Sequence, residues 1–152
     1  MNLTPMIAVI GGRKADKKLL ASAEEVGRLI AQKKAVLVSG GLAGIMDAAS
    51  KGAKMAGGIT IGILPHDHKR SANKYIDIPI ATGLGIGRNV VIARTADAFI
   101  AIGGAYGTLS EIAFALQLEK PVVGIKTWDI KGVISAENAE DAVNKVFDLL
   151  RI

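Results

Sequence analysis

The chain has 152 residues, 50% of them hydrophobic and 4% aromatic, and a formal net charge of +5. This length suits one domain with a sizeable core, so we predict a single domain over residues 1–152. The chain contains no cysteine, which excludes disulfides, thiolate metal sites and a cysteine nucleophile. Basic residues are scattered among acidic ones. Nucleic-acid binding is therefore not expected, whereas a site that attracts anionic small molecules is.

Membrane attachment and export are not expected from the sequence. No hydrophobic run reaches the roughly 20 residues that a membrane helix requires. The first residues do not resemble a signal peptide, because the first apolar run begins at Met6 without a charged segment before it. We therefore expect a cytoplasmic protein.

Apolar runs alternate with amphipathic stretches along the chain. In chain order we predict a strand over 6–10, a helix over 16–32, a strand over 35–39, a helix from after Gly44 to 56, a strand over 59–64, a short strand over 80–82, a helix over 86–96, a strand over 97–102, a helix over 106–118, a last strand over 121–125 and a helix over 139–150. Asp16 is placed to cap the first helix, and Gly57 to end the second. The polar segment Pro65–Pro79 is predicted to be a long exposed loop.

Strands separated by helical crossovers indicate a parallel sheet with helices on both faces. The predicted strands are nearly all apolar, as burial on both faces requires. We predict an α/β fold, a single doubly wound parallel sheet of the Rossmann-like kind. Ligands of such sheets bind beyond the carboxyl ends of the strands.

Glycine-rich loops follow the predicted strands at that edge. They are Gly11–Lys14, Ser39–Gly44, Thr82–Asn89 and Gly103–Thr108. None of them is a Gly-x-Gly-x-x-Gly dinucleotide fingerprint with an acidic residue on the following strand, and none carries a Walker lysine. One such loop is ordinary turn chemistry, but several at one edge favour an anionic ligand of nucleotide size.

The loop over residues 103–108 carries the strongest functional signal. It follows an apolar strand and opens a helix, so its backbone N–H groups and the helix N-terminus suit a phosphate or another anion. Thr108 offers a hydroxyl at the mouth of this turn. Glu111 is expected in the first helical turn, as a capping partner or as a group beside the ligand.

These motifs make the chain recognisable. Gly40–Met46 resembles a Gly-Gly-Gly-x-x-Gly-Leu-Met segment, residues 103–111 resemble a Pro-Gly-Gly-x-Gly-Thr-x-x-Glu signature, and Arg88-Asn89 resembles an Arg-Lys pair. All belong to the family once labelled "lysine decarboxylase-like". That family includes the Lonely Guy cytokinin-activating phosphoribohydrolases and the molybdenum cofactor carrier proteins. The resemblance covers most of the chain and implies the Rossmann-like fold.

The departures from the signature bear on the reaction. Gly103 stands in place of the signature proline, Ala105 in place of its second glycine, and Asn89 in place of the lysine of the hydrolases. In those enzymes the arginine and the signature glutamate act on a nucleoside 5′-monophosphate, and the matching positions here are Arg88 and Glu111. The Gly-Arg-Asn sequence and the form of the signature are more similar to the molybdenum cofactor carrier branch.

The predicted ligand-binding residues are those of the glycine loops with their charged neighbours. They are Gly12, Arg13, Gly40, Gly41, Gly44, Arg88, Asn89, Gly103, Gly104, Gly107, Thr108 and Glu111. Arg88 could grip a phosphate bidentately or be a surface arginine that caps a carbonyl. Glu111 could be a general acid–base or orient Arg88, or else satisfy backbone N–H groups at the helix start. Thr108 is a phosphate ligand, an N-cap, or each in turn.

Other polar residues are given ordinary roles. Asp47 is interpreted as an acid in the first turn of its helix. His66 and His68 flank Asp67 in a polar loop, a spacing that is usually solvated, and we predict no metal site.

Two ligand-dependent functions remain open at this point, beside a third class, a purely structural assembly subunit whose melting temperature no phosphate compound would shift. The first is a binding protein for a phosphate-bearing, nucleotide-like ligand, most similar to a molybdenum cofactor carrier, with the molybdenum cofactor or an AMP-like nucleotide as ligand and no required cofactor. The alternative is a phosphoribohydrolase that cleaves an N-glycosidic bond, with Arg88 and Glu111 as the catalytic residues. A decarboxylase that uses pyridoxal phosphate is not expected, because no loop lysine has an evident Schiff-base setting. We also expect a homodimer or larger homo-oligomer, paired through the hydrophobic helices over 86–96 and 106–118.

Overall fold

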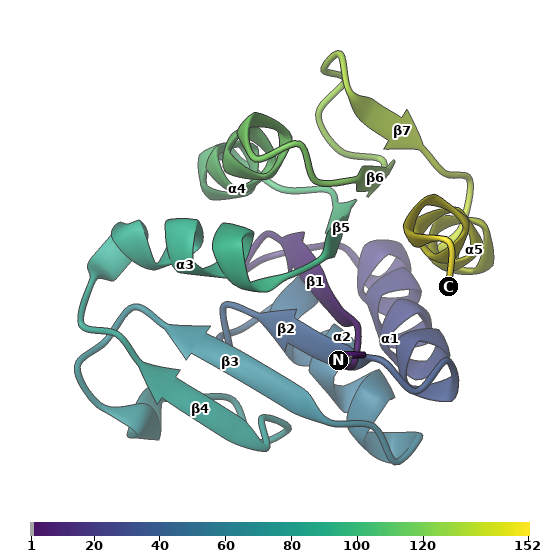
Figure 1. Cartoon of the computed structure of the whole chain (residues 1–152). Coiled ribbons are helices and arrows are strands. Elements are labelled where there is room, and N and C mark those ends of the chain that lie inside the picture. The colour runs from purple at the N-terminus through teal and green to yellow at the C-terminus, as the bar shows by residue number, and fades with distance from the viewer. Residues whose placement is uncertain (1) are drawn as a thin grey trace.

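A computed structural model describes residues 2–152. Seven parallel strands form one sheet in the order β4-β3-β2-β1-β5-β6-β7 (Figure 1). In chain order the elements are β1 (Met6–Gly11), α1 (Lys17–Gln32), β2 (Val36–Ser39), α2 (Ile45–Met55), β3 (Thr60–Leu64), the 3₁₀ turn η1 (Lys69–Ser71), β4 (Ile78–Ala81), the 3₁₀ turn η2 (Gly85–Gly87), α3 (Arg88–Thr95), β5 (Ala98–Ile102), α4 (Tyr106–Gln117), β6 (Val122–Ile125), β7 (Val133–Ser135) and α5 (Ala139–Leu150).

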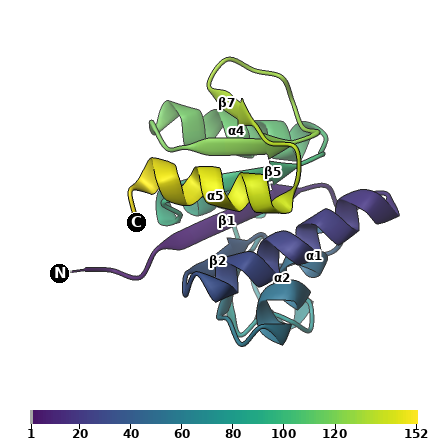
Figure 2. The same cartoon turned by 90° about the vertical axis from the view of Figure 1, so that its right-hand side faces the viewer.

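Helices cover both faces of the sheet. Successive strand side chains point to opposite faces, and the core divides accordingly. Ile100 belongs to the cluster that packs against α1, α2 and α5, whereas its neighbour Phe99 belongs to the cluster under α3 and α4. Figure 2 shows α1 and α5 lying along the same side of the sheet. The predicted doubly wound, Rossmann-like α/β fold is confirmed.

The residues predicted to begin the first helix and to end the second are also confirmed. Asp16 is the N-cap of α1, and its Oδ1 accepts a hydrogen bond from Leu19 N–H at 2.8 Å. Gly57 lies just beyond α2 with a φ of 79°, as a left-handed helix terminus requires.

The largest errors of the sequence prediction lie at the sheet edges. Val133–Ser135 forms an additional parallel strand beside β6, so 121–125 is not the last strand. At the other edge β4 begins at Ile78, inside the segment predicted as a loop, and its side chains are mostly exposed. Edge strands lack a buried apolar run, because one side of the strand has no neighbour and backbone pairing alone holds it.

The strand order places a topological switch point between β1 and β5. The chain builds outward from β1 to β4, then crosses back to lay β5 on the other side of β1. The loops after β1 and β5 leave in opposite directions from this point, which is where open α/β sheets bind ligands. Within residues 2–152, no helix is both long and apolar enough to cross a membrane.

Candidate ligand-binding site

The turn after β5 presents backbone donors to open space. Gly104 has a φ of 102°, and a Cβ there would lie 2.3 Å from Thr108 Oγ1, so only glycine fits. A Cβ on Gly107 would meet no atom within 4 Å. Within the described chain, no acceptor bonds the N–H groups of Tyr106, Gly107 or Thr108. The start of α4 therefore carries the free N–H groups and positive dipole end that suit an anion.

The structure excludes the capping alternatives for two residues of this helix. The N-cap of α4 is Ala105, which makes no side-chain capping bond, so Thr108 lies inside the first turn rather than at the cap. Its side chain is buried beneath the turn. Glu111 lies in the second turn, not the first as expected, and is buried without bonding the helix-start N–H groups.

Arg88 is buried, with 8% exposure, and its guanidinium is held by backbone oxygens. Its Nε donates to Ile63 O at 2.9 Å and its Nη2 to Gly40 O at 3.4 Å, at the ends of β3 and β2. A Cβ on Gly40 would lie 2.6 Å from Arg88 Nη2, so glycine at this position makes room for the guanidinium. Arg88 does bond carbonyls, but it is not the surface arginine of the alternative interpretation.

A chain of side-chain hydrogen bonds joins Arg88 to the start of α4. Arg88 Nη1 donates to Asn89 Oδ1 at 2.6 Å, and Asn89 Nδ2 donates to Ser110 Oγ at 3.1 Å. Ser110 Oγ in turn donates to Gly107 O at 2.7 Å. Ser110 belongs to the signature form that resembles the carrier branch, but no binding role was predicted for it, because a serine inside a helix carries no functional signal until its partners are known. The chain couples the position of the cation to that of the glycine turn.

Burial and mutual charge set the electrostatics of Arg88 and Glu111. Burial raises the pKa of Glu111 to about 7, and the Arg88 charge partly opposes this rise. Burial likewise lowers the pKa of Arg88, and the Arg13 charge adds to that lowering, while Glu111 opposes it. No ion pair joins Arg88 to Glu111 within residues 2–152. Glu111 thus exchanges its proton near neutral pH beside a fixed cation.

The loop after β1 lies between the glycine turn after β2 and the glycine turn after β5. A Cβ on Gly12 would lie 3.8 Å from Gly104 Cα, and Gly12 O accepts the N–H of Ile45 at 3.1 Å. A Cβ on Gly44 would lie 2.3 Å from the same Gly12 oxygen. Arg13 borders a hollow beside Gly44.

The remaining predicted residues of this edge have local roles. Gly41 packs against Leu64 and Gly62, and its oxygen accepts from Asn73 N–H at 2.8 Å. Gly103 forms the first residue of the α4 turn, and its oxygen accepts from Thr127 Oγ1 at 2.6 Å. These contacts hold the loops in place.

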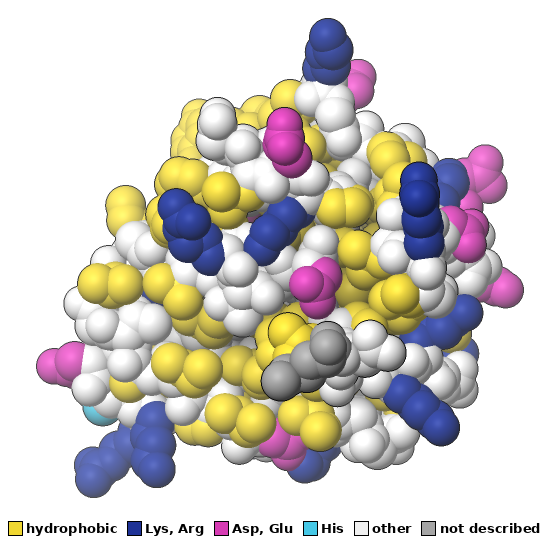
Figure 3. All heavy atoms as spheres, viewed as in Figure 1, with side chains coloured by type: hydrophobic (Ala, Val, Ile, Leu, Met, Phe, Trp, Pro, Cys, Tyr) yellow, Lys and Arg dark blue, Asp and Glu magenta, His cyan; other side chains and the backbone are white. Residues whose placement is uncertain are grey.

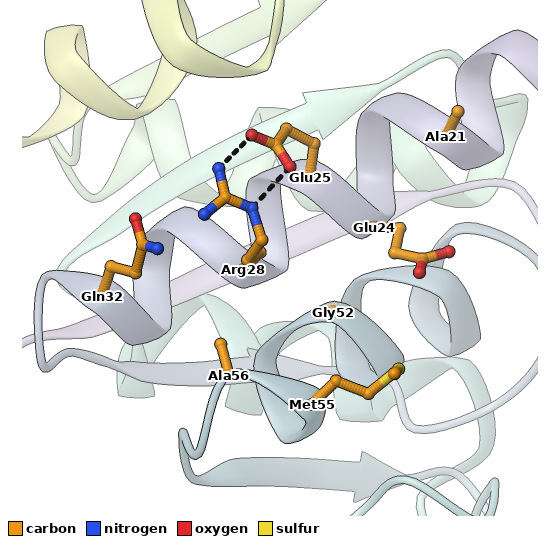
Figure 4. A pocket seen from close by; sticks show the side chains of 8 residues that line it. All are labelled: Ala21, Glu24, Glu25, Arg28, Gln32, Gly52, Met55 and Ala56. Carbon is orange, nitrogen blue, oxygen red and sulfur yellow. Dashed lines mark hydrogen bonds and ion pairs between the residues drawn. The ribbon is translucent and has the colours of Figure 1, made fainter.

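A second hollow lies away from the strand edge, between α1 and α2 (Figure 4). Its charged side chains already have partners, since Arg28 pairs with Glu25 and Lys51 with Glu24.

His66 and His68 stack on each other with ring centroids 5.7 Å apart. Within residues 2–152, no group of three or more His, Cys, Asp or Glu side chains is placed to hold a metal ion.

Comparison with known proteins identifies the family. The SLOG cluster4 family matches the chain over residues 4–149. The chain belongs to this family. Among curated relatives, an uncharacterized protein of Archaeoglobus fulgidus is 47% identical over 139 residues, which is 91% of either chain. A cytokinin riboside 5′-monophosphate phosphoribohydrolase of Mycobacterium tuberculosis is 32% identical over 120 residues, which span 73% of this chain and 64% of that enzyme.

Solved structures of cofactor carriers are similar along almost the whole chain. The molybdenum cofactor binding protein of Rippkaea orientalis has a TM-score of 0.92 and 36% identity, with 97% of this chain and 98% of that one covered. The Moco carrier protein of Chlamydomonas reinhardtii has a TM-score of 0.89 and 38% identity, over 98% and 99% of the two chains. The predicted resemblance to the Lonely Guy family and its carrier branch is confirmed.

Proposed function

We propose that this protein binds a phosphate-bearing, nucleotide-like small molecule, and that it acts as a carrier of the molybdenum cofactor type. The observation that carries the proposal is the start of α4, where unbonded N–H groups border the open space at Gly107 and Arg88 is held nearby. The molybdenum cofactor binding protein and the Moco carrier protein with TM-scores of 0.92 and 0.89 support the choice of ligand class.

Arg88 and Glu111 suit a phosphate in different ways. Three guanidinium bonds to protein oxygens orient Arg88 and leave N–H groups over for a ligand. An ionised carboxylate beside a phosphate would repel it. A Glu111 with a pKa of about 7 can take up a proton at little cost and become a neutral donor.

Isothermal titration with inorganic phosphate, ribose 5-phosphate, AMP and molybdate tests this proposal. Phosphate compounds should bind, and chromatography should find no free base after long incubation with AMP. Stoichiometric hydrolysis at useful rates would defeat the carrier proposal. A crystal grown in sulfate should carry an anion at Gly107, and an anion elsewhere with this turn empty would undo the assignment.

The enzyme alternative is a nucleoside 5′-monophosphate phosphoribohydrolase. It rests on a buried Glu111 with a pKa of about 7 that feels the charge of Arg88, and on the 32% identical mycobacterial hydrolase. Asn89 distinguishes the two functions, because it bonds Arg88 where the hydrolases carry a second cation. If Asn89→Lys creates or sharply raises release of ribose phosphate, the asparagine is what prevents the wild type from catalysing hydrolysis. If the wild type is already active and Glu111→Ala abolishes activity while AMP still binds, the enzyme function is correct.

We further propose a homodimer or larger homo-oligomer paired through α3 and α4. Ile92 of α3 and Ile112 of α4 are buried in the core, but Ile86 of η2, just before α3, is 89% exposed, and Tyr106 and Phe114 of α4 are 82% and 38% exposed. Figure 3 shows hydrophobic side chains spread over the face that carries α3 and β4. Light scattering should give a mass above 15.8 kDa at micromolar concentration, and Ile86→Asp should reduce it. A wild-type monomer contradicts the proposal.

The cytoplasmic location and the single domain over residues 1–152 stay predictions.

A further inference from the structure

A hollow beside the Gly40–Gly44 loop has no role in the contacts described above. It is lined by three separate stretches of chain: Arg13 after β1, residues 42–44 with Asp47 at the start of α2, and His66, Ser71 and Asn73 between β3 and β4. Its volume of about 580 Å³ lies within the range of about 300–1,000 Å³ that is typical of small-molecule sites.

The two walls of the hollow are joined to each other by hydrogen bonds. Asn73 N–H donates to Gly41 O at 2.8 Å, and Asn73 Nδ2 donates to Leu42 O at 2.9 Å. Asn73 Oδ1 accepts from Tyr75 N–H at 3.0 Å, which keeps the asparagine in this orientation. The segment between β3 and β4 is therefore a fixed wall of the hollow.

Polar groups of the lining have unmet hydrogen-bonding capacity. The half-buried Asp47 carboxylate makes no ion pair or hydrogen bond with residues 2–152. The Ser71 hydroxyl is buried and has no hydrogen-bond partner in the described chain. The Ser71 hydroxyl can donate or accept, whereas an ionised Asp47 carboxylate only accepts, so Asp47 favours a ligand that supplies donors.

The loop after β1 links the hollow to the turn assigned to the phosphate. Gly12 lies against Gly104 on one side, and its oxygen bonds Ile45 N–H at the start of α2 on the other. Arg13, the next residue, borders the hollow and lowers the pKa of Arg88 through its charge. A single ligand with a phosphate at one end and a ring at the other can therefore occupy both places.

We propose that this hollow holds the heterocycle of the ligand, and that Asp47 selects a 2-amino-4-oxopyrimidine ring, the ring edge shared by guanine and pterins. This inference rests on the proposed function. Such an edge offers a ring N–H and an amino N–H side by side, which match the two oxygens of one carboxylate. Adenine offers an amino donor beside a ring nitrogen acceptor, so one Asp47 oxygen would face a lone pair.

The test is titration of 5′-GMP, 5′-IMP and 5′-AMP into wild type, Asp47→Asn and Asp67→Asn. IMP keeps the ring N–H but lacks the 2-amino group. Wild type should bind GMP about tenfold or more tightly than IMP or AMP, because hydrogen bonds to a charged group are strong. Asp47→Asn presents one acceptor and one donor, and should lose the GMP preference and gain affinity for AMP. Asp67→Asn removes an exposed charge from a neighbouring loop and should behave as wild type.

Each outcome decides the inference. Equal binding of GMP and AMP by wild type overturns it, even if Asp47→Asn fails to fold, and so does an unchanged preference in a folded Asp47→Asn. In both cases the proposed function stands if Arg88→Ala weakens all three nucleotides. If no nucleotide binds and neopterin monophosphate does not bind either, the proposed function fails as well. Comparing neopterin monophosphate with GMP tells which source of the ring is preferred.

Discussion

The glycine turns after β2 and β5 have similar sequences, but only the second leaves a glycine facing open space. In the turn after β2, the space beside each glycine is filled by the protein itself. A Cβ on Gly40 would meet Arg88, and one on Gly44 would meet Gly12 O at 2.3 Å. In the turn after β5, Gly107 faces open space and neighbouring N–H groups have no acceptor.

This difference separates two reasons for a glycine. After β2 the glycines allow close packing of backbone against a buried arginine, so their contribution to a ligand site acts through Arg88. After β5 the open side of Gly107 leaves room for something the chain does not contain. A glycine-rich loop is therefore evidence of a ligand site only where the structure shows that a glycine faces space that the protein does not fill.

The same substitution at both turns gives the largest expected effect. Gly44→Val forces a side chain onto Gly12 O at a φ of 71° and should cost about 2–6 kcal/mol of unfolding free energy. Gly107→Val should change stability by less than about 1 kcal/mol, since a Cβ there meets no atom within 4 Å, yet it should abolish phosphate binding. Urea denaturation and titration with AMP measure the two effects. Equal destabilisation would remove the distinction between the turns.

The pH dependence of stability tests the buried acid behind the second turn. Burial raises the pKa of Glu111 from its ordinary value of 4.5 to about 7 in the folded protein, so the native carboxyl holds a proton more tightly than the unfolded one. That stabilisation is complete below pH 4.5 and is lost as pH rises through 7. Wild type loses this stabilisation as pH rises, and Glu111→Gln does not. The unfolding free energy of Glu111→Gln minus that of wild type should therefore increase by about 3 kcal/mol from pH 4 to pH 8.

Glu119→Gln is the matched control, because Glu119 is exposed. Denaturation at several pH values should show a difference only for Glu111→Gln. A parallel pH profile for wild type and Glu111→Gln would mean that Glu111 titrates as a solvated acid does.

Replacing Arg88 tests whether this cation serves the ligand or only the turn after β2. Arg88→Ala should weaken AMP binding by about 1.5–3 kcal/mol, the scale of a hydrogen bond to a charged group. Adenosine binding should change much less. Arg70→Ala, at an exposed arginine, is the control. Equal losses for AMP and adenosine in titrations would show that Arg88 supports the fold or contacts another part of the ligand.

The smallest effect is expected at the link between the two regions. Ser110→Ala removes the hydroxyl that joins Asn89 to Gly107 O, and should weaken AMP binding by about 0.5–1.5 kcal/mol. Ser135→Ala, on the edge strand β7, should leave AMP binding unchanged. If calorimetry shows no change for Ser110→Ala, the position of Arg88 does not depend on this chain of bonds.

Local patterns in the sequence are enough to predict the fold class and the sheet edge at which the candidate site lies. Alternating apolar runs and amphipathic stretches predict parallel strands with helices on both faces, because burial on both faces demands apolar strands. The motifs around Arg88 and over residues 103–111 led to the family, and the caps at Asp16 and Gly57 follow local rules. These are properties of residues close together in the chain.

Contacts between residues far apart in the chain follow from the three-dimensional packing and could not be predicted from local patterns. The strand order places β5 beside β1, so that Gly104 faces Gly12, and the reach of Arg88 to Ile63 and Gly40 joins three loops. The edge strand β7 and the hollow at Asp47 depend on neighbours that local patterns do not record. Burial, which raises the pKa of Glu111 to about 7, is likewise a sum over surrounding elements, and no single stretch of sequence contains it.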